Sequence, residues 1–340
     1  MSVMLRAAGR RPFTTPLGRR LDFTVLGQGG VAVGAMFGSL DEVGAAAVMD
    51  AAWDAGLRYY DTAPLYGFGQ SERRVGRALR NRPRDTFVLS TKVGRLLEPD
   101  AAMRSEAKVR FDYARDGVRR SFDESLARLG LDRVDILFVH DAELPTHGAA
   151  DVYEAHWNDL TRRGGWQALT ELRAAGVVQA IGLGVNDAAA CERMLAELDP
   201  DVFLLAGRYT LLEQTPLHGL MANCQRRGVG VVIGGPFNSG VLVRHGGTFN
   251  YAAAPADVVA RVERLRTVCE RFGTPLPAAA LQFPAAHPAV VSVIPGGGSV
   301  AEVQSNVAWF EAPLPAALWV ALKQEGLVDR VAPVPATEAA

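Results

Sequence analysis

Short apolar runs alternate with longer amphipathic stretches along most of the chain. The runs are rich in β-branched residues and predict strands, and the stretches show apolar residues at helical spacing and predict helices. The predicted pairs of strand and helix are 25–26 with 41–55, 57–60 with 70–81, 86–90 with 114–129, 134–139 with 166–175, 177–183 with 188–198, 202–205 with 217–227, 229–233 with 257–272, and 290–294 with 300–309.

This alternation predicts an α/β fold with a parallel sheet, because parallel neighbours need a long crossover connection. The strand runs are apolar on both faces, as expected when helices cover one side and a packed interior fills the other. Glycines follow several predicted helices, as left-handed caps would, at Gly56, Gly130, Gly176 and Gly228. Eight such units in a chain of 340 residues predict a (β/α)₈ TIM barrel.

The two ends of the chain extend this barrel, which we expect over about residues 23–312. A small strand pair is predicted around residues 13–23, and a C-terminal extension with a short helix near 316–326 is predicted over 313–340. No stretch rich in Pro, Gly and Ser divides the chain, so residues 1–340 are expected to form a single domain.

A Rossmann domain followed by a second domain is the competing architecture. Residues 27–32 satisfy a loose G-x-G-x-x-G/A pattern after a strand-like run. The following residues 31–40 contain Gly34 and Gly38 and show no helical periodicity, which argues against this alternative. We expect the glycines to let the first loop approach a ligand closely.

Composition restricts the function classes without choosing one. With 36 basic and 37 acidic residues, the formal net charge of -1 gives no general attraction for nucleic acid or anionic membranes. No stretch is apolar for long enough to predict a transmembrane helix. The first 20 residues are rich in arginine, which weakly resembles an organellar presequence, but a tail before the strand pair is favoured and a cytoplasmic location is expected. The cysteines are far apart and predict free thiols: Cys191, Cys224 and Cys269.

Ionisable side chains stand at the carboxyl ends of three consecutive predicted strands. These residues are Asp61, Lys92 and His140, and Tyr66 follows in the loop after Asp61. Each has a structural explanation on its own, such as an Asp61–Lys92 ion pair or a buried histidine. Together they predict an active site, because burying four polar groups at one rim is unfavourable without a function.

Three motifs in order resemble the aldo-keto reductase family. Residues 56–67 with Ser71 and Glu72 resemble its G-x-x-x-x-D-T-A-x-x-Y-G…S-E signature, and residues 90–94 resemble its S-T-K segment. Residues 121–140 resemble its S-L-x-R-L-x-x-D-x-x-D-x-x-x-x-H stretch. The resemblance covers about residues 20–312. It implies a catalytic tetrad of Asp61, Tyr66, Lys92 and His140.

The chemistry of these side chains fits hydride transfer between a nicotinamide cofactor and a carbonyl or carbinol carbon. A free tyrosine titrates near ~10, so we expect the Lys92 ammonium to lower the pKa of Tyr66 while Asp61 holds Lys92 in place. His140 is expected to orient the substrate oxygen. No metal is expected, because the sequence shows no ligand cluster.

The resemblance also implies contacts to the nicotinamide. Asn186 matches the residue that binds the carboxamide, but Val185, Ala206 and Gly234 replace the family's serine, glutamine and stacking tyrosine at neighbouring positions. Whether Phe237 replaces the stacking tyrosine is left open. The segment 234–242 resembles a subgroup, the aldose 1-dehydrogenases of L-fucose or D-threo-aldose type, and adds further candidate cofactor contacts, Ser239, Gly240 and Leu242.

Residues after the last predicted strand resemble the family's segment for the phosphate and adenine. The candidates are Gly296, Gly298, Glu302 and Asn306. Members selective for NADP carry a lysine and an arginine where Gly296 and Glu302 stand. A carboxylate at 302 repels a 2′-phosphate and accepts hydrogen bonds from a free ribose hydroxyl, which favours NAD over NADP and hence dehydrogenation. Alternatively, Glu302 is only a solvated acid in the first turn of a helix.

The substrate is less defined. Phe37 in the first loop and Trp157 in the long loop 141–165 are candidate contacts to a small-molecule sugar or carbonyl substrate. The leading prediction is oxidation of an aldose at C1 to the lactone. The alternatives are a general aldehyde or ketone reductase, a pyridoxal dehydrogenase, and a cofactor-sensing binding subunit with low turnover. The oligomeric state does not follow from the sequence.

Overall fold

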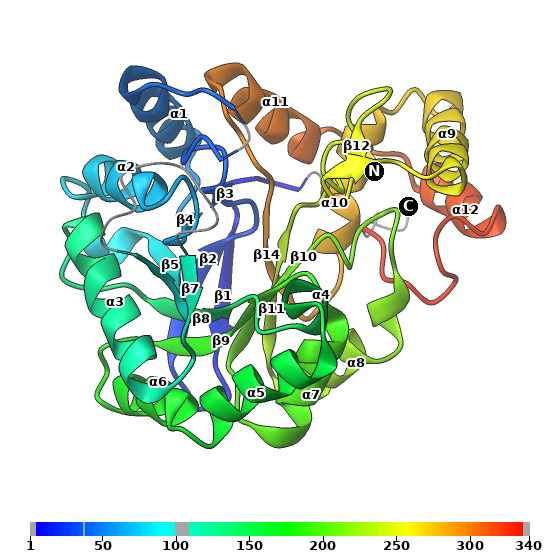
Figure 1. The fold of residues 1–340 in the computed structure, drawn as a ribbon. Coiled ribbons are helices and arrows are strands. Elements are labelled where there is room, and N and C mark those ends of the chain that lie inside the picture. Colours follow the sequence, from blue (N-terminus) through cyan, green and yellow to red (C-terminus); the bar gives the residue numbers. More distant parts are fainter. Residues whose placement is uncertain (1–4, 37, 99–108, 336–340) are drawn as a thin grey trace.

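The computed structural model describes residues 5–36, 38–98 and 109–335, and it contains the predicted barrel (Figure 1). Eight parallel strands form one sheet in the order β14-β11-β10-β9-β8-β5-β4-β3. Bridges from Leu26 to Val293 and from Gly29 to Gly296 join the first and last strands and close the sheet. The strands are β3 Gln28–Gly29, β4 Tyr59–Asp61, β5 Val88–Val93, β8 Ile136–His140, β9 Ala180–Val185, β10 Val202–Ala206, β11 Gly230–Gly234 and β14 Val290–Ile294.

A ring of helices surrounds the strands. Its members are α1 Glu42–Asp54, α2 Gln70–Leu79, α3 Arg115–Leu129, α6 Gly165–Ala174, α7 Ala188–Glu197, α8 Leu220–Arg227, α10 Leu276–Ala285 and α11 Val300–Glu311. The glycine caps are confirmed. Gly130 and Gly228, for example, end α3 and α8 with φ values of 62° and 67°.

One predicted barrel helix is corrected by the structure. The stretch predicted over 257–272 is α9 Ala256–Arg271, which packs against α10 and against the C-terminal helix α12 Ala316–Gln324. The helix that lies on the barrel beside β14 is α10. It was missed because every residue is buried, so it has no polar face, and because it contains Pro277 and Pro284. The loop 141–165 also contains two unpredicted helices, α4 Leu144–His147 and α5 Ala150–Thr161.

Alternation along each strand separates the barrel interior from the layer between strands and helices. Tyr59, Val88, Ile136 and Phe138 belong to the interior cluster of apolar side chains. Their neighbours Tyr60, Leu89, Leu137 and Val139 belong to the larger core beneath the helices. The same period of two directs Asp61, Lys92 and His140 to the interior, at the carboxyl ends of their strands.

The N-terminal strand pair packs against the end of the barrel where the parallel strands begin. Strands β1 Arg10–Thr14 and β2 Arg20–Thr24 pair in an antiparallel manner, as predicted. Phe23 of β2 meets the interior residue Tyr59 edge to face at 4.9 Å between ring centroids. This hairpin covers the end where the strands begin, which leaves the carboxyl ends for the cavity described below.

The glycine-rich segment after residue 26 is not the start of a Rossmann helix, because α1 begins only at Glu42, after the N-cap Asp41. A Cβ atom on Gly30 would lie 2.5 Å from the carbonyl oxygen of Asp61, and one on Gly34 would lie 2.6 Å from that of Tyr66. These glycines therefore allow close packing against the chain around Asp61 and Tyr66. No helix within the described ranges is long and apolar enough to cross a membrane.

Candidate active site

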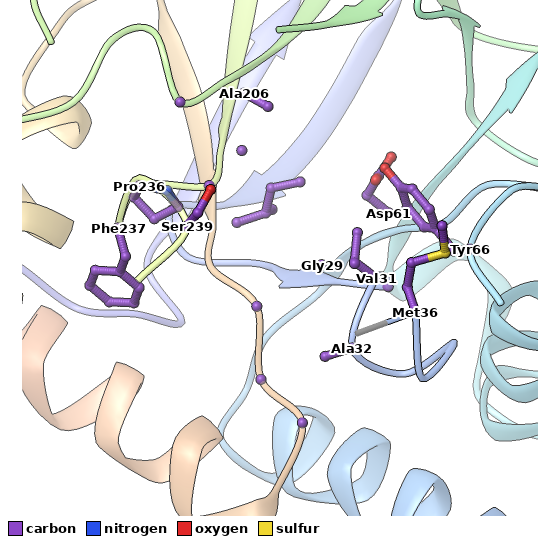
Figure 2. A pocket seen from close by; sticks show the side chains of 18 of the residues that line it. Gly29, Val31, Ala32, Met36, Asp61, Tyr66, Ala206, Pro236, Phe237 and Ser239 are labelled. Atoms are coloured by element: carbon purple, nitrogen blue, oxygen red, sulfur yellow. The ribbon is translucent and has the colours of Figure 1, made fainter. Parts of the chain in front are cut away.

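A cavity of about 810 Å³ opens at the carboxyl ends of the strands. Figure 2 shows Asp61 and Tyr66 on one side of it and Pro236, Phe237 and Ser239 on the opposite side. Lys92 and His140 line the same cavity, so the structure brings the four predicted side chains together. This is the position where barrels of this type collect functional groups from several strands.

Lys92 and Asp61 form a buried ion pair in the floor of the cavity. The Lys92 Nζ lies 2.6 Å from Asp61 Oδ2, and the two side chains are 1% and 3% exposed. Nζ also donates to the carbonyl oxygen of Thr62 at 3.0 Å, and the Ser90 hydroxyl donates to Asp61 Oδ1 at 2.7 Å. Such additional bonds are what a charged pair needs when it leaves water.

Tyr66 and His140 stand over this pair. The Lys92 Nζ lies 4.6 Å from the centroid of the Tyr66 ring, and the Tyr66 and His140 rings meet edge to face at 5.8 Å. His140 Nδ1 is buried and has no hydrogen-bond partner among the described residues. A phenol and an imidazole that face one cavity form a suitable pair of groups to bind a carbonyl or hydroxyl oxygen and exchange a proton with it.

Burial dominates the titration of these groups. The pKa of Tyr66 is raised well above its ordinary value by burial first, and then by the charges of Asp61 and Asp141. The expected net lowering of this pKa is therefore wrong, because burial and the charges of Asp61 and Asp141 outweigh the nearby cations. Burial, with Lys92 and Arg95 nearby, holds the pKa of His140 well below its ordinary value, so the imidazole is neutral at pH 7.

A second, partly buried ion pair beside His140 was not predicted. Arg95, at the start of β6 Arg95–Leu97, binds Asp141, and both residues line the cavity. Asp141 Oδ2 lies 3.5 Å from His140 Nε2. The strand β6 pairs with β7 Val109–Phe111 outside the barrel. Arg95 therefore does not stand at the end of a barrel strand, where the sequence predicts functional residues. Asp141 directly follows His140, and this acid next to a predicted catalytic residue is the one sign of the ion pair in the sequence.

Glu143 is a buried acid that was also missed. It is 1% exposed and accepts a hydrogen bond from the backbone N–H of Asn186 at 2.6 Å. The Asn186 side-chain Nδ2 donates to it at 3.4 Å and the Thr146 hydroxyl at 2.9 Å. Burial, and then the charge of Asp141, raises the pKa of Glu143 from 4.5 to about 7.

The other end of the cavity is lined by glycines and by polar side chains. Gly296, Gly298, Glu302 and Asn306 all lie there, as predicted, with Ser239 and Gly240 of the segment after β11. Asn306 Nδ2 donates to the carbonyl oxygen of Gly296 at 3.0 Å, and Glu302 accepts from the Gly298 N–H at 2.8 Å. A Cβ atom on Gly296 would meet no atom within 4 Å, so a ligand has access to the backbone there.

Two predicted contacts do not line the cavity. Trp157 is 1% exposed, donates through Nε1 to Glu197 and does not line the cavity, because it faces the core from α5. Leu242 is fully buried in the core, and its neighbour Val243 lines the cavity instead. Phe37 lies outside the described residues. Phe237 lines the cavity opposite Tyr66, with its ring edge-on to Trp309 of α11 at 6.1 Å.

Ser71 and Glu72 of the first motif support the site without lining it. The Ser71 hydroxyl donates to the carbonyl oxygen of Gly30 at 2.8 Å. Glu72 is fully buried, accepts from the Thr91 hydroxyl at 2.7 Å and pairs with Arg128 of α3 at 2.5 Å. These bonds connect α2 to the first loop, to β5 and to α3. They join residues of all three motifs.

Comparison with known proteins agrees with this geometry. The model of the Aldo/keto reductase family matches residues 25–324. The chain belongs to the aldo/keto reductase family. It is similar to pyridoxal 4-dehydrogenase from Microbacterium luteolum, with 43% identity over 92% of this chain and 97% of that protein. It is also similar to D-threo-aldose 1-dehydrogenase from Pseudomonas sp, with 39% identity over 91% and 95% of the two chains.

A solved structure gives the same fold. The holo form of an aldo-keto reductase from Bacillus halodurans superposes with a TM-score of 0.75 at 26% identity, over 93% of this chain and 96% of that one. The protein is therefore an oxidoreductase that acts on CH–OH and C=O groups with a nicotinamide cofactor. Within the described residues, no group of three or more His, Cys, Asp or Glu side chains is arranged to hold a metal ion.

The residues of this chain fit a dinucleotide. The cavity runs from the polar group around Tyr66 to the N-terminus of α11, whose cap is Ser299. Helix N-termini and exposed glycine backbone favour phosphate groups, and a cavity of this size accepts a ligand of this kind.

The raised pKa of Glu143 predicts a pH-dependent stability. A carboxyl whose folded-state pKa is raised binds its proton more tightly in the folded state, so its contribution to stability falls as pH rises from about 4.5 to about 7. Relative to wild type, Glu143→Gln should gain roughly 3 kcal/mol in free energy of unfolding over this range. Urea unfolding at pH 5 and pH 8 measures this difference, and a difference that stays constant with pH contradicts it.

Proposed function

We propose that this chain oxidises an aldose at C1, converting the cyclic hemiacetal to the lactone, with Tyr66 as the acid–base residue. The observation that carries the proposal is the convergence of Asp61, Tyr66, Lys92 and His140 on one cavity. A bound oxidised nicotinamide would supply the acceptor for the hydride from C1. In its ionised form Tyr66 accepts the proton of the hemiacetal hydroxyl, and neutral His140 hydrogen-bonds the same oxygen and orients it.

The surroundings of His140 suit a ring with several hydroxyl groups. The Arg95–Asp141 pair lines the cavity beside His140 and offers a donor and an acceptor for neighbouring hydroxyls. Tyr251 lines the cavity as well, held in a left-handed backbone conformation with φ of 63°. Its backbone N–H donates to the Ser239 hydroxyl at 3.2 Å. An aromatic ring at a cavity mouth suits the apolar face of a sugar or a flat heterocycle.

Pyridoxal is a second candidate, supported by the 43% identity to a pyridoxal 4-dehydrogenase. Its aldehyde and neighbouring hydroxymethyl group close to a cyclic hemiacetal, as an aldose does. The same proton and hydride transfers therefore oxidise either compound to a lactone. This shared chemistry distinguishes both candidates from a general aldehyde reductase.

A substrate panel tests the reaction and the role of Tyr66 together. We expect NAD⁺-dependent oxidation of at least one of L-fucose, D-arabinose, L-galactose, L-glucose and pyridoxal, followed by absorbance of the reduced nicotinamide. Pyridoxal 5′-phosphate should not react, because its blocked hydroxyl prevents ring closure. Tyr66→Phe should lower kcat by a factor of about 10² to 10⁴, the usual contribution of a positioned acid–base group.

The matched control is Tyr209→Phe, since Tyr209 is a buried tyrosine outside the cavity and should keep full activity. Because the pKa of Tyr66 is raised, the rate of oxidation should increase with pH. Cofactor binding without turnover of any substrate would overturn the proposal and favour a cofactor-sensing subunit. Full activity in Tyr66→Phe would remove the assigned role of this residue.

We also propose that the preferred cofactor is NAD. Glu302 lines the cavity in the first turn of α11, with Arg244 Nη2 at 4.0 Å from its Oε1. A carboxylate at this end repels a 2′-phosphate and accepts hydrogen bonds from a ribose hydroxyl. Arg244 also lines the cavity, and solvent screens both charges, because the two side chains are 77% and 52% exposed.

Removing this carboxylate should shift the cofactor preference. Glu302→Gln is expected to raise kcat/KM with NADP⁺ roughly tenfold relative to NAD⁺, and Glu302→Arg to raise it further. The control is Asp257→Asn, which removes an exposed acid from the first turn of α9 outside the cavity. A wild-type preference for NADP⁺, or a ratio unchanged in both Glu302 variants, would contradict the proposal.

A further inference from the structure

Asn186 is the amide side chain that stands beside His140 in the cavity. It follows β9, whose Gly184 pairs with His140, and it lines the cavity with Val185, Gly234 and Ala206. These three neighbours offer no polar side-chain atom. The other nearby amide, Asn238, already uses both of its groups, since it accepts from Thr210 at 2.6 Å and donates to Gly207 at 3.0 Å.

The orientation of the Asn186 amide is set by Glu143. Both carboxyl oxygens of Glu143 accept hydrogen bonds, Oε1 from the Thr146 hydroxyl at 2.9 Å and Oε2 from the Asn186 backbone N–H at 2.6 Å. The side chain of Asn186 therefore turns its NH₂ group toward Glu143, with Nδ2 at 3.4 Å from Oε1. The amide oxygen accepts no hydrogen bond among the described residues and is left for the cavity. The 2.6 Å bond from the backbone N–H of Asn186 to the same carboxylate fixes the main chain at this position.

Glu143 is an unfavourable residue to bury without a purpose. It is 1% exposed, and within the described residues no lysine, arginine or histidine forms an ion pair with it. The charged group nearest in sequence is Asp141, whose like charge adds to the cost of ionising it, while Arg95 is already paired with Asp141. An unpaired buried acid beside an active site is typical of a functional position.

We propose that Glu143 is a positioning residue for the nicotinamide: it locks the Asn186 amide so that its oxygen accepts a hydrogen bond from the carboxamide NH₂ group of the cofactor. This inference rests on the proposed function, in which the nicotinamide lies beside Tyr66 and His140. Glu143 itself does not line the cavity and acts through Asn186.

The experiment compares binding of two ligands that differ in the nicotinamide. NAD⁺ and ADP-ribose share the adenosine and both phosphates, but ADP-ribose has no carboxamide. Wild-type protein should bind NAD⁺ more tightly than ADP-ribose in titrations followed by calorimetry. In Glu143→Gln the new NH₂ group can donate to the Asn186 oxygen and allow the amide to flip, so the affinity for NAD⁺ should fall about tenfold, the usual effect of one lost hydrogen bond.

The affinity for ADP-ribose should stay within about twofold in the same variant. Glu143→Ala is expected to show the same loss of affinity for NAD⁺ with little change for ADP-ribose. Asn186→Ala should show this difference too, without a change at residue 143. The matched control is Glu197→Gln. Glu197 accepts from Trp157 at 2.7 Å, lies on α7 and does not line the cavity, so both affinities should remain those of wild type.

Two results would overturn the inference. An unchanged ratio of the two affinities in Glu143→Gln would show that Glu143 does not orient the amide. Equal losses for both ligands would show that Glu143 only maintains the local structure. The proposed function is judged separately, by wild-type protein alone: if it binds NAD⁺ and oxidises a hemiacetal while the variant ratio is unchanged, the proposed function stands and this inference fails.

Discussion

The ion pair between Lys92 and Asp61 is the interaction on which the rest of the site depends. Two charges that are almost fully buried lose several kcal/mol each in hydration, and their attraction offsets this only with good geometry and further hydrogen bonds. Ser90 and Thr62 provide those bonds, and β9 leaves room with a glycine, because a Cβ atom on Gly184 would lie 3.1 Å from Lys92 Cε. Neighbouring segments thus provide the hydrogen bonds and the space that this ion pair needs. Tyr66 and His140 lie beside this pair in the cavity wall, and burial is the main cause of their shifted pKa values.

Much of this arrangement follows from the sequence because parallel strands end at one edge. The alternation of side chains along β4, β5 and β8 directs Asp61, Lys92 and His140 to the barrel interior. The glycine caps were also predicted correctly, because a helix end in the left-handed conformation depends on the local sequence alone. That the chain is one domain stays a prediction. Helix α10 was missed since a helix buried on all sides shows no periodicity, and the amphipathic α9 was taken in its place.

The remaining features depend on contacts between segments that the sequence does not relate. Arg95 reaches Asp141 from a hairpin outside the barrel, and Glu143 reaches Asn186 across two loops. Trp157 was assigned to the substrate because it is aromatic and lies in a long loop, but that loop is helical and Trp157 faces the core. The pKa of Tyr66 was predicted in the wrong direction because burial and the charges of Asp61 and Asp141 outweigh the nearby cations.

We propose that the buried pair is kept for proton exchange and not for stability. The direct test replaces both partners with apolar side chains, Lys92→Met with Asp61→Leu, and measures urea unfolding and the oxidation of the best substrate. Replacing a buried ion pair in this way is often neutral or stabilising by about 1–4 kcal/mol. We therefore expect a double variant at least as stable as wild type, with turnover as low as that of Tyr66→Phe. Turnover within about tenfold of wild type (roughly 1.4 kcal/mol in activation free energy) would show that proton exchange does not need the pair.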